Sequence, residues 1–159
     1  MKFSSMLILF LILLSSCAGV STKKNVAHLD LVNYGLLNAG VEKTVDLNST
    51  ATGKHNINTS AEFFETTNEI KANLKSAFGI KYNINGLNTG KSVKLKFVVI
   101  HPPINGKTIS SVFVKGYIGS WRADFYTFDE EYELVPGEWV MQVYEGDELL
   151  LEQAFNIKI

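Results

Sequence analysis

The sequence predicts an all-β domain in which two antiparallel sheets pack face to face as a sandwich of about seven to nine strands. From residue 77 to the end, apolar and polar side chains alternate with a period of two, as they do in a strand with one buried face. Turn residues interrupt these runs about every 8 to 12 residues. A chain of 159 residues suits a single packed core, so one domain is expected.

The first part of the domain is predicted to contain two strands, at His28–Leu37 and Lys43–Leu47, around a turn at residues 38–40 (NAG). The polar stretch at residues 48–60 (NSTATGKHNINTS) favours a surface loop. The composition of residues 61–75 permits a helix, but its Phe and Thr pairs favour a strand.

The clearest strand lies at Phe78–Ile84, where every even position is apolar and every odd position is polar or glycine. A second runs over Val93–Val99, which begins with the same alternation and then becomes apolar on both faces. Pro102 and Pro103 are expected to end it, because proline cannot donate a ladder hydrogen bond. Ile109–Ile118 is a third strand candidate.

The last two strands form a hairpin. Pro136 and Gly137 match the central positions of a type II turn, after which Trp139, Met141 and Val143 share one face. A tight turn at residues 145–147 leads into a final strand whose inner face includes Gln153, so a bulge or a buried, hydrogen-bonded amide is expected there. A disulfide is excluded, and five aromatic residues are expected to form the core instead: Phe78, Phe97, Phe113, Trp139 and Phe155.

The N-terminus has the pattern of a secretory signal. Lys2 precedes a nine-residue apolar run that is too short to span a bilayer, which takes about 20 residues. The run ends at Leu14-Ser15-Ser16-Cys17, which resembles the bacterial lipobox. That resemblance implies a lipid-modified Cys17, and several acyl chains give stable anchoring.

These features predict three segments: a signal peptide at residues 1–16 that is removed, a lipidated tether at 17–27, and an immunoglobulin-like β-sandwich domain at 28–159. Ala18 resembles the residue that follows the cysteine in lipoproteins sent to the outer membrane. The expected location is therefore the cell envelope, anchored in the outer membrane and facing the periplasm.

The second half of the chain also resembles a bacterial protein family, domain of unknown function 3859. The resemblance is strongest from residue 72 onward and rests on these motifs: Phe78-Gly79-x-x-Tyr82, Pro102-Pro103, Ile118-Gly119, Glu133-Leu134-Val135-Pro136-Gly137-x-Trp139 and Glu152-Gln153-x-Phe155. Tyr132 and the pair Asp147-Glu148 depart from the usual pattern. The family implies a fold and no activity.

Composition and motifs exclude several classes of function. A formal net charge of −1 and the lack of a basic stripe argue against nucleic-acid binding. His28, His55 and His101 are isolated in the sequence and are expected to be ordinary surface histidines rather than zinc ligands. The sequence contains no nucleophile elbow and no phosphate-binding loop. No cofactor, no metal and no catalytic residue is predicted.

An acidic segment at residues 124–133 contains Asp124, Asp129 and Glu131. Its oxygens suit a calcium ion or, as paired carboxylates, hydrolysis of a glycosidic bond. A solvated loop is the more common role of such a segment. A periplasmic hydrolase or metal-dependent enzyme that uses this loop is therefore the alternative hypothesis.

The best candidate for a binding surface is formed by Trp121, Arg122 and Tyr126. Aromatic rings beside an arginine stack on sugar rings or anchor a protein partner. Alternation along the strand places about half of the rings of this region in the core. The sequence therefore predicts a non-enzymatic binding or accessory module, held to the membrane by lipid, with an envelope protein or a glycan as its partner.

Overall fold

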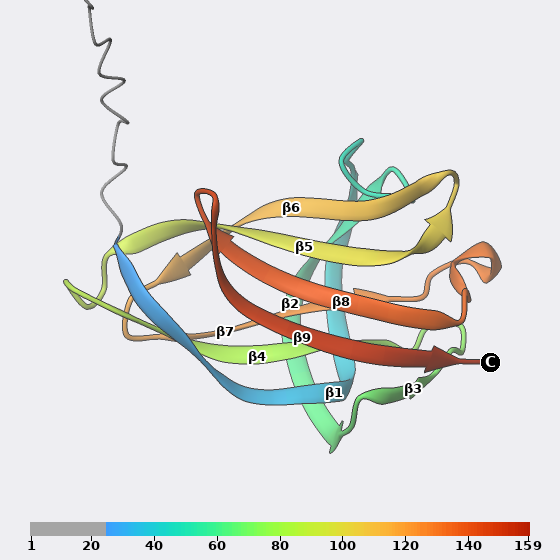
Figure 1. The fold of residues 1–159 in the computed structure, drawn as a ribbon, viewed down its shortest axis with the longest axis horizontal. Helices are drawn as coiled ribbons and strands as arrows, with labels where there is room; N and C mark the ends of the chain where they lie inside the picture. The colour runs from blue at the N-terminus through green and yellow to red at the C-terminus, as the bar shows by residue number, and fades with distance from the viewer. Residues whose placement is uncertain (1–24) are drawn as a thin grey trace, which may run out of the picture.

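In the computed structural model, which describes residues 25–159, two β-sheets pack face to face (Figure 1). The sandwich prediction is confirmed. Nine strands and one short 3₁₀ helix follow one another along the described chain: β1 Val26–Asp46, β2 Lys54–Thr66, β3 Glu69–Lys71, β4 Ala77–Gly86, β5 Ser92–Ile104, β6 Lys107–Tyr117, β7 Trp121–Thr127, η1 Glu131–Glu133, β8 Gly137–Glu145 and β9 Glu148–Lys158.

One sheet has four strands in the order β2-β1-β4-β7, and the other has five in the order β3-β9-β8-β5-β6. All pairs are antiparallel except β3 with β9. The segments predicted at residues 1–16 and the lipidation site Cys17 lie outside the described residues. Within the part described, no helix is long and apolar enough to cross a membrane.

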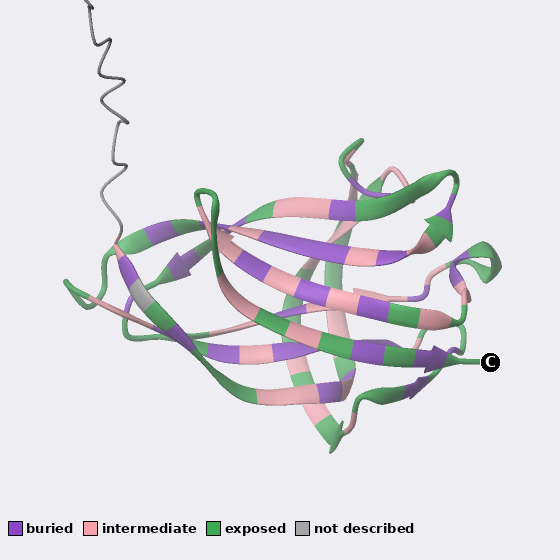
Figure 2. Ribbon diagram, in the orientation of Figure 1, coloured by how far each residue is buried: buried purple, intermediate pink, exposed green. Residues whose placement is uncertain are grey.

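The core lies between the sheets and follows the predicted alternation (Figure 2). The even residues of β4 from Phe78 to Ile84 are completely buried, as are Trp139, Met141 and Val143 of β8. The Trp139 ring contacts the rings of Phe78 and Phe128 edge-on. Phe113, predicted for the core, is instead 62 % exposed, because it lies on the outer face of the edge strand β6.

The predicted turn at residues 38–40 is wrong, because β1 is one continuous strand. Its register shifts on both sides of Val41, so the chain bends through bulges instead of reversing. Gly40 permits a close approach there: a side chain would meet Ser60 Oγ at 2.5 Å. Beyond Leu37, β1 pairs only with β2, and this two-stranded segment, residues 38–62, is called the arm below.

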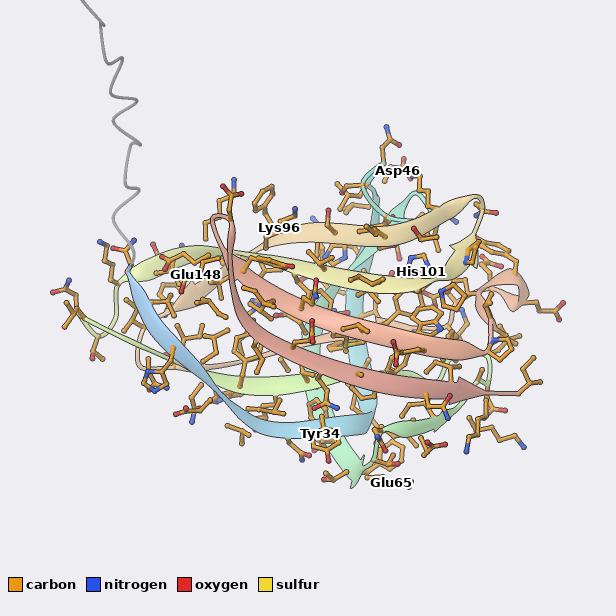
Figure 3. The ribbon with its side chains drawn as sticks, in the orientation of Figure 1. Tyr34, Asp46, Glu65, Lys96, His101 and Glu148 are labelled. Carbon is orange, nitrogen blue, oxygen red and sulfur yellow. The ribbon has the colours of Figure 1, made fainter. Side chains whose placement is uncertain are left out.

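The arm crosses behind the sandwich almost at right angles to the other strands and reaches β6, with Asp46 close to its tip (Figures 1 and 3). Its turn is fixed by Ser111 N–H, which donates to Ser49 O at 2.9 Å, and by Ala51 N–H, which donates to Ser110 Oγ at 2.8 Å. Lys107 donates to two carbonyls of the same turn. The loop predicted at residues 48–60 is therefore partly wrong, since β2 starts at Lys54.

Two smaller expectations also change. Pro102 and Pro103 lie within β5, and they are tolerated because the ladder skips from Ile100 to Ile104. The bulge predicted near Gln153 lies elsewhere in β9. The register shifts between the pair Leu151–Val143 and the pair Leu149–Tyr144. Gln153 is half-buried and donates to Ala154 O. Residues 61–75 contain strand and no helix, as their aromatic and Thr pairs favoured.

Candidate functional site

The arm covers a cavity of about 350 Å³ at the edge of the sandwich where β6 and β7 lie. The walls come from the arm, the inner faces of β5 and β6, the end of β7, and the segment that contains η1. Small-molecule sites commonly have volumes of about 300 to 1,000 Å³. The cavity is therefore the candidate site.

The floor of the cavity is apolar. Phe97 and Val99 of β5 are buried, and Val112 of β6, which pairs with Phe97, is half-buried. Phe125 and Tyr126 of β7 also line the cavity, from adjacent positions whose side chains point to opposite faces of the strand. These side chains offer a ligand a surface for apolar and stacking contact.

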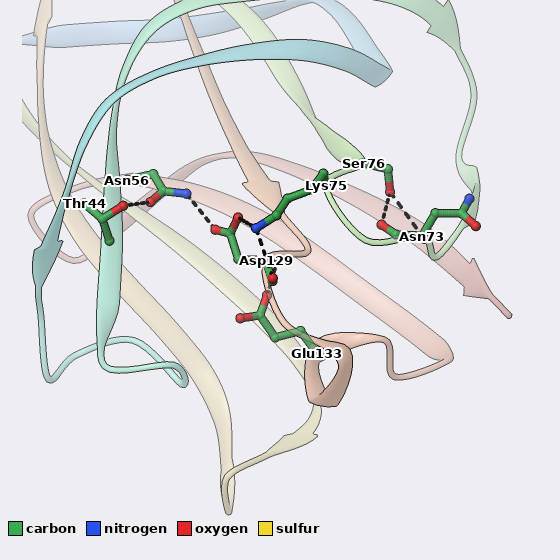
Figure 4. A network of polar contacts seen from close by, with 7 residues as sticks. All are labelled: Thr44, Asn56, Asn73, Lys75, Ser76, Asp129 and Glu133. Atoms are coloured by element: carbon green, nitrogen blue, oxygen red, sulfur yellow. Dashed lines mark hydrogen bonds and ion pairs between the residues drawn. The ribbon is translucent and has the colours of Figure 1, made fainter.

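One wall is held by a polar network centred on Asp129 (Figure 4). Its carboxylate accepts hydrogen bonds from Lys75 Nζ at 3.0 Å and from Asn56 Nδ2 at 2.8 Å. Thr44 Oγ1 donates to Asn56 Oδ1, and Asp129 N–H donates to Glu133 Oε2 at 3.0 Å. The network ties the arm to η1, and it neutralises the charge of Asp129 within the protein.

Tyr126 has the one buried side-chain polar atom that makes no hydrogen bond within the described residues. Burial, together with the negative charge of Glu133, raises the pKa of Tyr126, so the phenol stays protonated. Burial also raises the pKa of the Glu133 carboxyl. The Tyr126 hydroxyl in turn lowers the pKa of Glu133, so the two groups are close neighbours at the edge of the cavity.

His55 extends the cavity lining from β2. It is half-buried, and burial lowers the pKa of its imidazole, which favours the neutral ring near pH 7. No hydrogen bond of the ring occurs within residues 25–159. A neutral imidazole offers one donor and one acceptor.

A second polar cluster lies between the sheets but does not line the cavity. Asp124, 5 % exposed, accepts a hydrogen bond from the Tyr82 hydroxyl at 2.6 Å. Arg122 binds the same carboxylate through Nη2 at 2.6 Å and through Nε. Arg122 Nη1 also donates to Lys115 O of β6. This cluster joins the two sheets and leaves Asp124 without a free oxygen for catalysis.

The three predicted binding residues do not form one surface, because β7 places alternate side chains on opposite faces. Trp121 is 58 % exposed on the outer face, with Lys81 Nζ 4.4 Å from its ring. Arg122 points inward to Asp124. Tyr126 points inward and lines the cavity.

The residues of the predicted acidic segment are also separated. Asp129, Glu130 and Glu133 line the cavity, whereas Asp124 lies in the inter-sheet cluster and Glu131 is exposed outside the lining. No group of three metal-binding side chains occurs among the residues that the structure describes. The sequence reasoning missed His55 and Asn56, because their polar segment resembles a loop.

His101 is buried, so its expected surface position is wrong. It lies at the opposite end of the sandwich from Glu148 (Figure 3). Its Nδ1 is 2.8 Å from Pro102 O, which only accepts, so Nδ1 carries the proton. The Ser110 hydroxyl then donates to Nε2 at 3.1 Å while its oxygen accepts from Ala51 N–H. This chain of hydrogen bonds fixes the tip of the arm to β5 and β6.

The stability of the protein is therefore expected to fall in mild acid. Burial lowers the pKa of His101 below its ordinary value of 6.5, so below pH 6.5 this residue binds more protons in the unfolded chain than in the folded one. The His101 contribution is fully present above pH 6.5 and is lost as pH falls toward the lowered pKa. Urea unfolding between about pH 7.5 and 5 should show this slope, and His101→Gln should make the slope shallower. An equal slope in the variant would contradict this account.

Comparison with known proteins supports the fold. The model of the family described as Domain of unknown function (DUF3859) matches residues 25–157. An immunoglobulin-like protein from Pseudomonas aeruginosa is similar over 83 % of this chain and 98 % of its own, with 22 % identity and a TM-score of 0.53. Pseudomonas fluorescens alkylpurine DNA glycosylase AlkC matches 58 % of this chain and 28 % of its own, with 10 % identity and a TM-score of 0.40. No curated protein matches.

Proposed function

The chain belongs to the DUF3859 family, whose domain has the immunoglobulin-like fold and no known function, and from that premise we propose that it is a non-enzymatic binding module of the bacterial envelope. Lipid on Cys17 would hold it to the outer membrane, facing the periplasm. The lipobox and the short apolar run before it support this anchor.

The cavity beneath the arm is the proposed binding site, and its chemistry favours an uncharged, hydroxyl-rich ligand. The Lys75 and Asp129 charges neutralise each other, and the pKa of Glu133 is raised. His55 and Tyr126 line the cavity with neutral side chains that can form hydrogen bonds, next to its apolar floor. A volume of about 350 Å³ accommodates one or two sugar rings, so a short glycan is the proposed ligand.

The Tyr126 hydroxyl, which lies beside the Glu133 carboxyl and meets no hydrogen-bond geometry within the described residues, is the observation that carries this proposal, and its removal provides the test. Calorimetric titration of the mature protein with N-acetylglucosamine, glucose and their β-linked disaccharides should detect binding of at least one. Tyr126→Phe should weaken that binding about 5- to 10-fold, the effect of one lost hydrogen bond. Tyr144→Phe removes a hydroxyl outside the cavity and should leave the affinity unchanged. Absence of binding by every sugar, or equal affinity in Tyr126→Phe, would refute the proposal.

The alternative hydrolase has weaker support. A glycosidase needs two carboxyl groups on opposite sides of the scissile bond, one as the acid and one free to act as base or nucleophile. Glu133 has the raised pKa of an acid, but both oxygens of Asp129 accept hydrogen bonds from Lys75 and Asn56. Unchanged disaccharides after incubation with the protein would agree with a binding role.

A further inference from the structure

The outer face of β5 and β6 carries a patch of basic and aromatic side chains, called the basic-aromatic patch below. Its members are Lys94, Lys96, Phe113, Lys115 and Tyr117. Lys94 lies directly opposite Lys115, Lys96 opposite Phe113, and Ser92 opposite Tyr117. These alternate positions all point away from the core of the sandwich.

The patch carries three positive charges, those of Lys94, Lys96 and Lys115. Within residues 25–159, none of the three ammonium groups forms an ion pair. Like charges directly opposite each other across a strand pair are destabilising. An anionic partner would relieve the repulsion between Lys94 and Lys115. By contrast, Lys158 on β9 is paired with Glu69.

Two aromatic rings lie among these lysines. Phe113 is 62 % exposed and Tyr117 is 44 % exposed. Lys94 Nζ lies 3.9 Å from the centre of the Phe113 ring, and Lys115 Nζ lies 5.0 Å from that of Tyr117. Lysines on an edge strand also discourage pairing with other chains, but that role does not require exposed rings. Aromatic rings are common at a membrane interface, and lysines are attracted to anionic headgroups. A membrane surface therefore accounts for both the rings and the lysines of the patch.

The start of the described chain lies beside this patch. Lys91, one residue before β5, donates to Asn25 Oδ1 at 2.7 Å, and Glu145 accepts from the backbone N–H of Asn25 and Val26. Both contacts fix the exit of the tether next to the end of β5 that carries Lys94. From Cys17 to Asn25 the chain spans at most about 28 Å. A lipid on Cys17 would therefore keep this end of the domain close to the membrane.

We propose that the basic-aromatic patch binds the surface of a phospholipid bilayer that contains anionic headgroups. This inference rests on the proposed lipid anchor, which would bring the domain to the membrane. It adds the orientation of the domain relative to the bilayer. With the patch on the bilayer, the domain lies on one side against the lipid. The cavity, whose lining lies on the inner face of β5 and β6 and on the arm, remains accessible.

The orientation can be measured with the mature lipidated protein in vesicles. Phe113→Trp combined with Trp121→Phe puts one exposed indole in the patch, since Trp139 is completely buried. Brominated phosphatidylcholine should quench this indole in vesicles that contain phosphatidylglycerol, but only weakly in neutral vesicles. Each lysine contributes about a fivefold change in membrane partition, so Lys94→Gln with Lys115→Gln should reduce the ratio of docked to undocked domain about 25-fold.

The matched control is Lys43→Gln with Lys71→Gln, which removes two exposed charges outside the patch and should leave quenching unchanged. Quenching that is independent of phosphatidylglycerol, or that survives loss of Lys94 and Lys115, would overturn the proposal. Binding to anionic vesicles without quenching of the indole would also overturn the proposal. The partner of the patch would then be an acidic protein. Flotation with neutral vesicles tests the lipid anchor separately. The anchor predicts that Cys17→Ser abolishes this flotation, whereas the patch proposal makes no such prediction.

Discussion

Replacing Trp139 with alanine is expected to lower the free energy of unfolding by about 3 to 5 kcal/mol. The side chain is completely buried, and its ring centre lies 4.9 Å from that of Tyr126 and 5.8 Å from that of Phe78. Its Nε1–H donates to Val135 O at 3.1 Å. Alanine would leave a large cavity between the sheets and an unpaired carbonyl, and neighbouring β-strands cannot collapse far enough to fill the space.

Equilibrium unfolding in urea, followed by circular dichroism, measures this effect. Trp121→Ala is the matched control, since it removes the same side chain from an exposed position and should change the unfolding free energy by less than about 1 kcal/mol. A neutral result for Trp139→Ala would mean that this ring does not hold the two sheets together.

Asp124→Ala should be about as damaging, with an expected loss of 3 to 5 kcal/mol, roughly the cost of breaking a buried ion pair. The substitution leaves the Arg122 guanidinium, whose side chain is 26 % exposed, without its carboxylate partner. It also leaves the buried Tyr82 hydroxyl without its acceptor. Most of the loss comes from these stranded groups rather than from the net strength of the pair.

A combined variant separates the cost of leaving these groups unpaired from the net strength of the ion pair. Removing all three polar groups, by Tyr82→Phe, Arg122→Met and Asp124→Leu together, leaves no charge or hydroxyl of the cluster unpaired and costs only the hydrogen bond to Lys115 O, so it should recover much of the stability lost in Asp124→Ala. Urea unfolding of both proteins at pH 7 gives the comparison. A combined variant that is less stable than Asp124→Ala would show that the cluster itself is a major source of stability.

The sequence predicts strands and core residues best where one face of a strand is buried and the other is exposed to solvent. The alternation at Phe78–Ile84 and at Trp139–Val143 identifies both the strands and the residues that are completely buried. Gly137 has a φ of 131°, a positive value that glycine adopts readily, at the predicted Pro-Gly corner. In each case the local pattern and the tertiary packing favour the same structure.

The arm shows where this reasoning fails. Strand β2 has no buried residue, so its sequence carries no period-two signal and resembles a polar loop. Gly40 suggests a turn, although it allows a close approach at a bulge. A large ring such as that of Phe113 is usually buried, and its position on an edge strand depends on the strand order.

The candidate site could be predicted only in part for the same reason. The aromatic ring of Tyr126 makes it a candidate, and Tyr126 does line the cavity. Trp121 belongs to the same predicted surface, although the odd and even positions of the two residues on β7 predict opposite faces. His55 and Asn56 reach the cavity only because the arm folds across the sandwich, and that contact joins segments far apart in the sequence.

The central claim is that the cavity beneath the arm is where this protein binds its ligand. Amide chemical-shift mapping by NMR, during titration with the sugar that calorimetry identifies, tests it most directly. The account predicts that the largest shifts cluster at Thr44, His55, Asn56, Tyr126 and Asp129, which lie on the arm and on the end of β7 with the segment after it, on two sides of the cavity. Shifts confined to Trp121 and the outer face of β7 would contradict it.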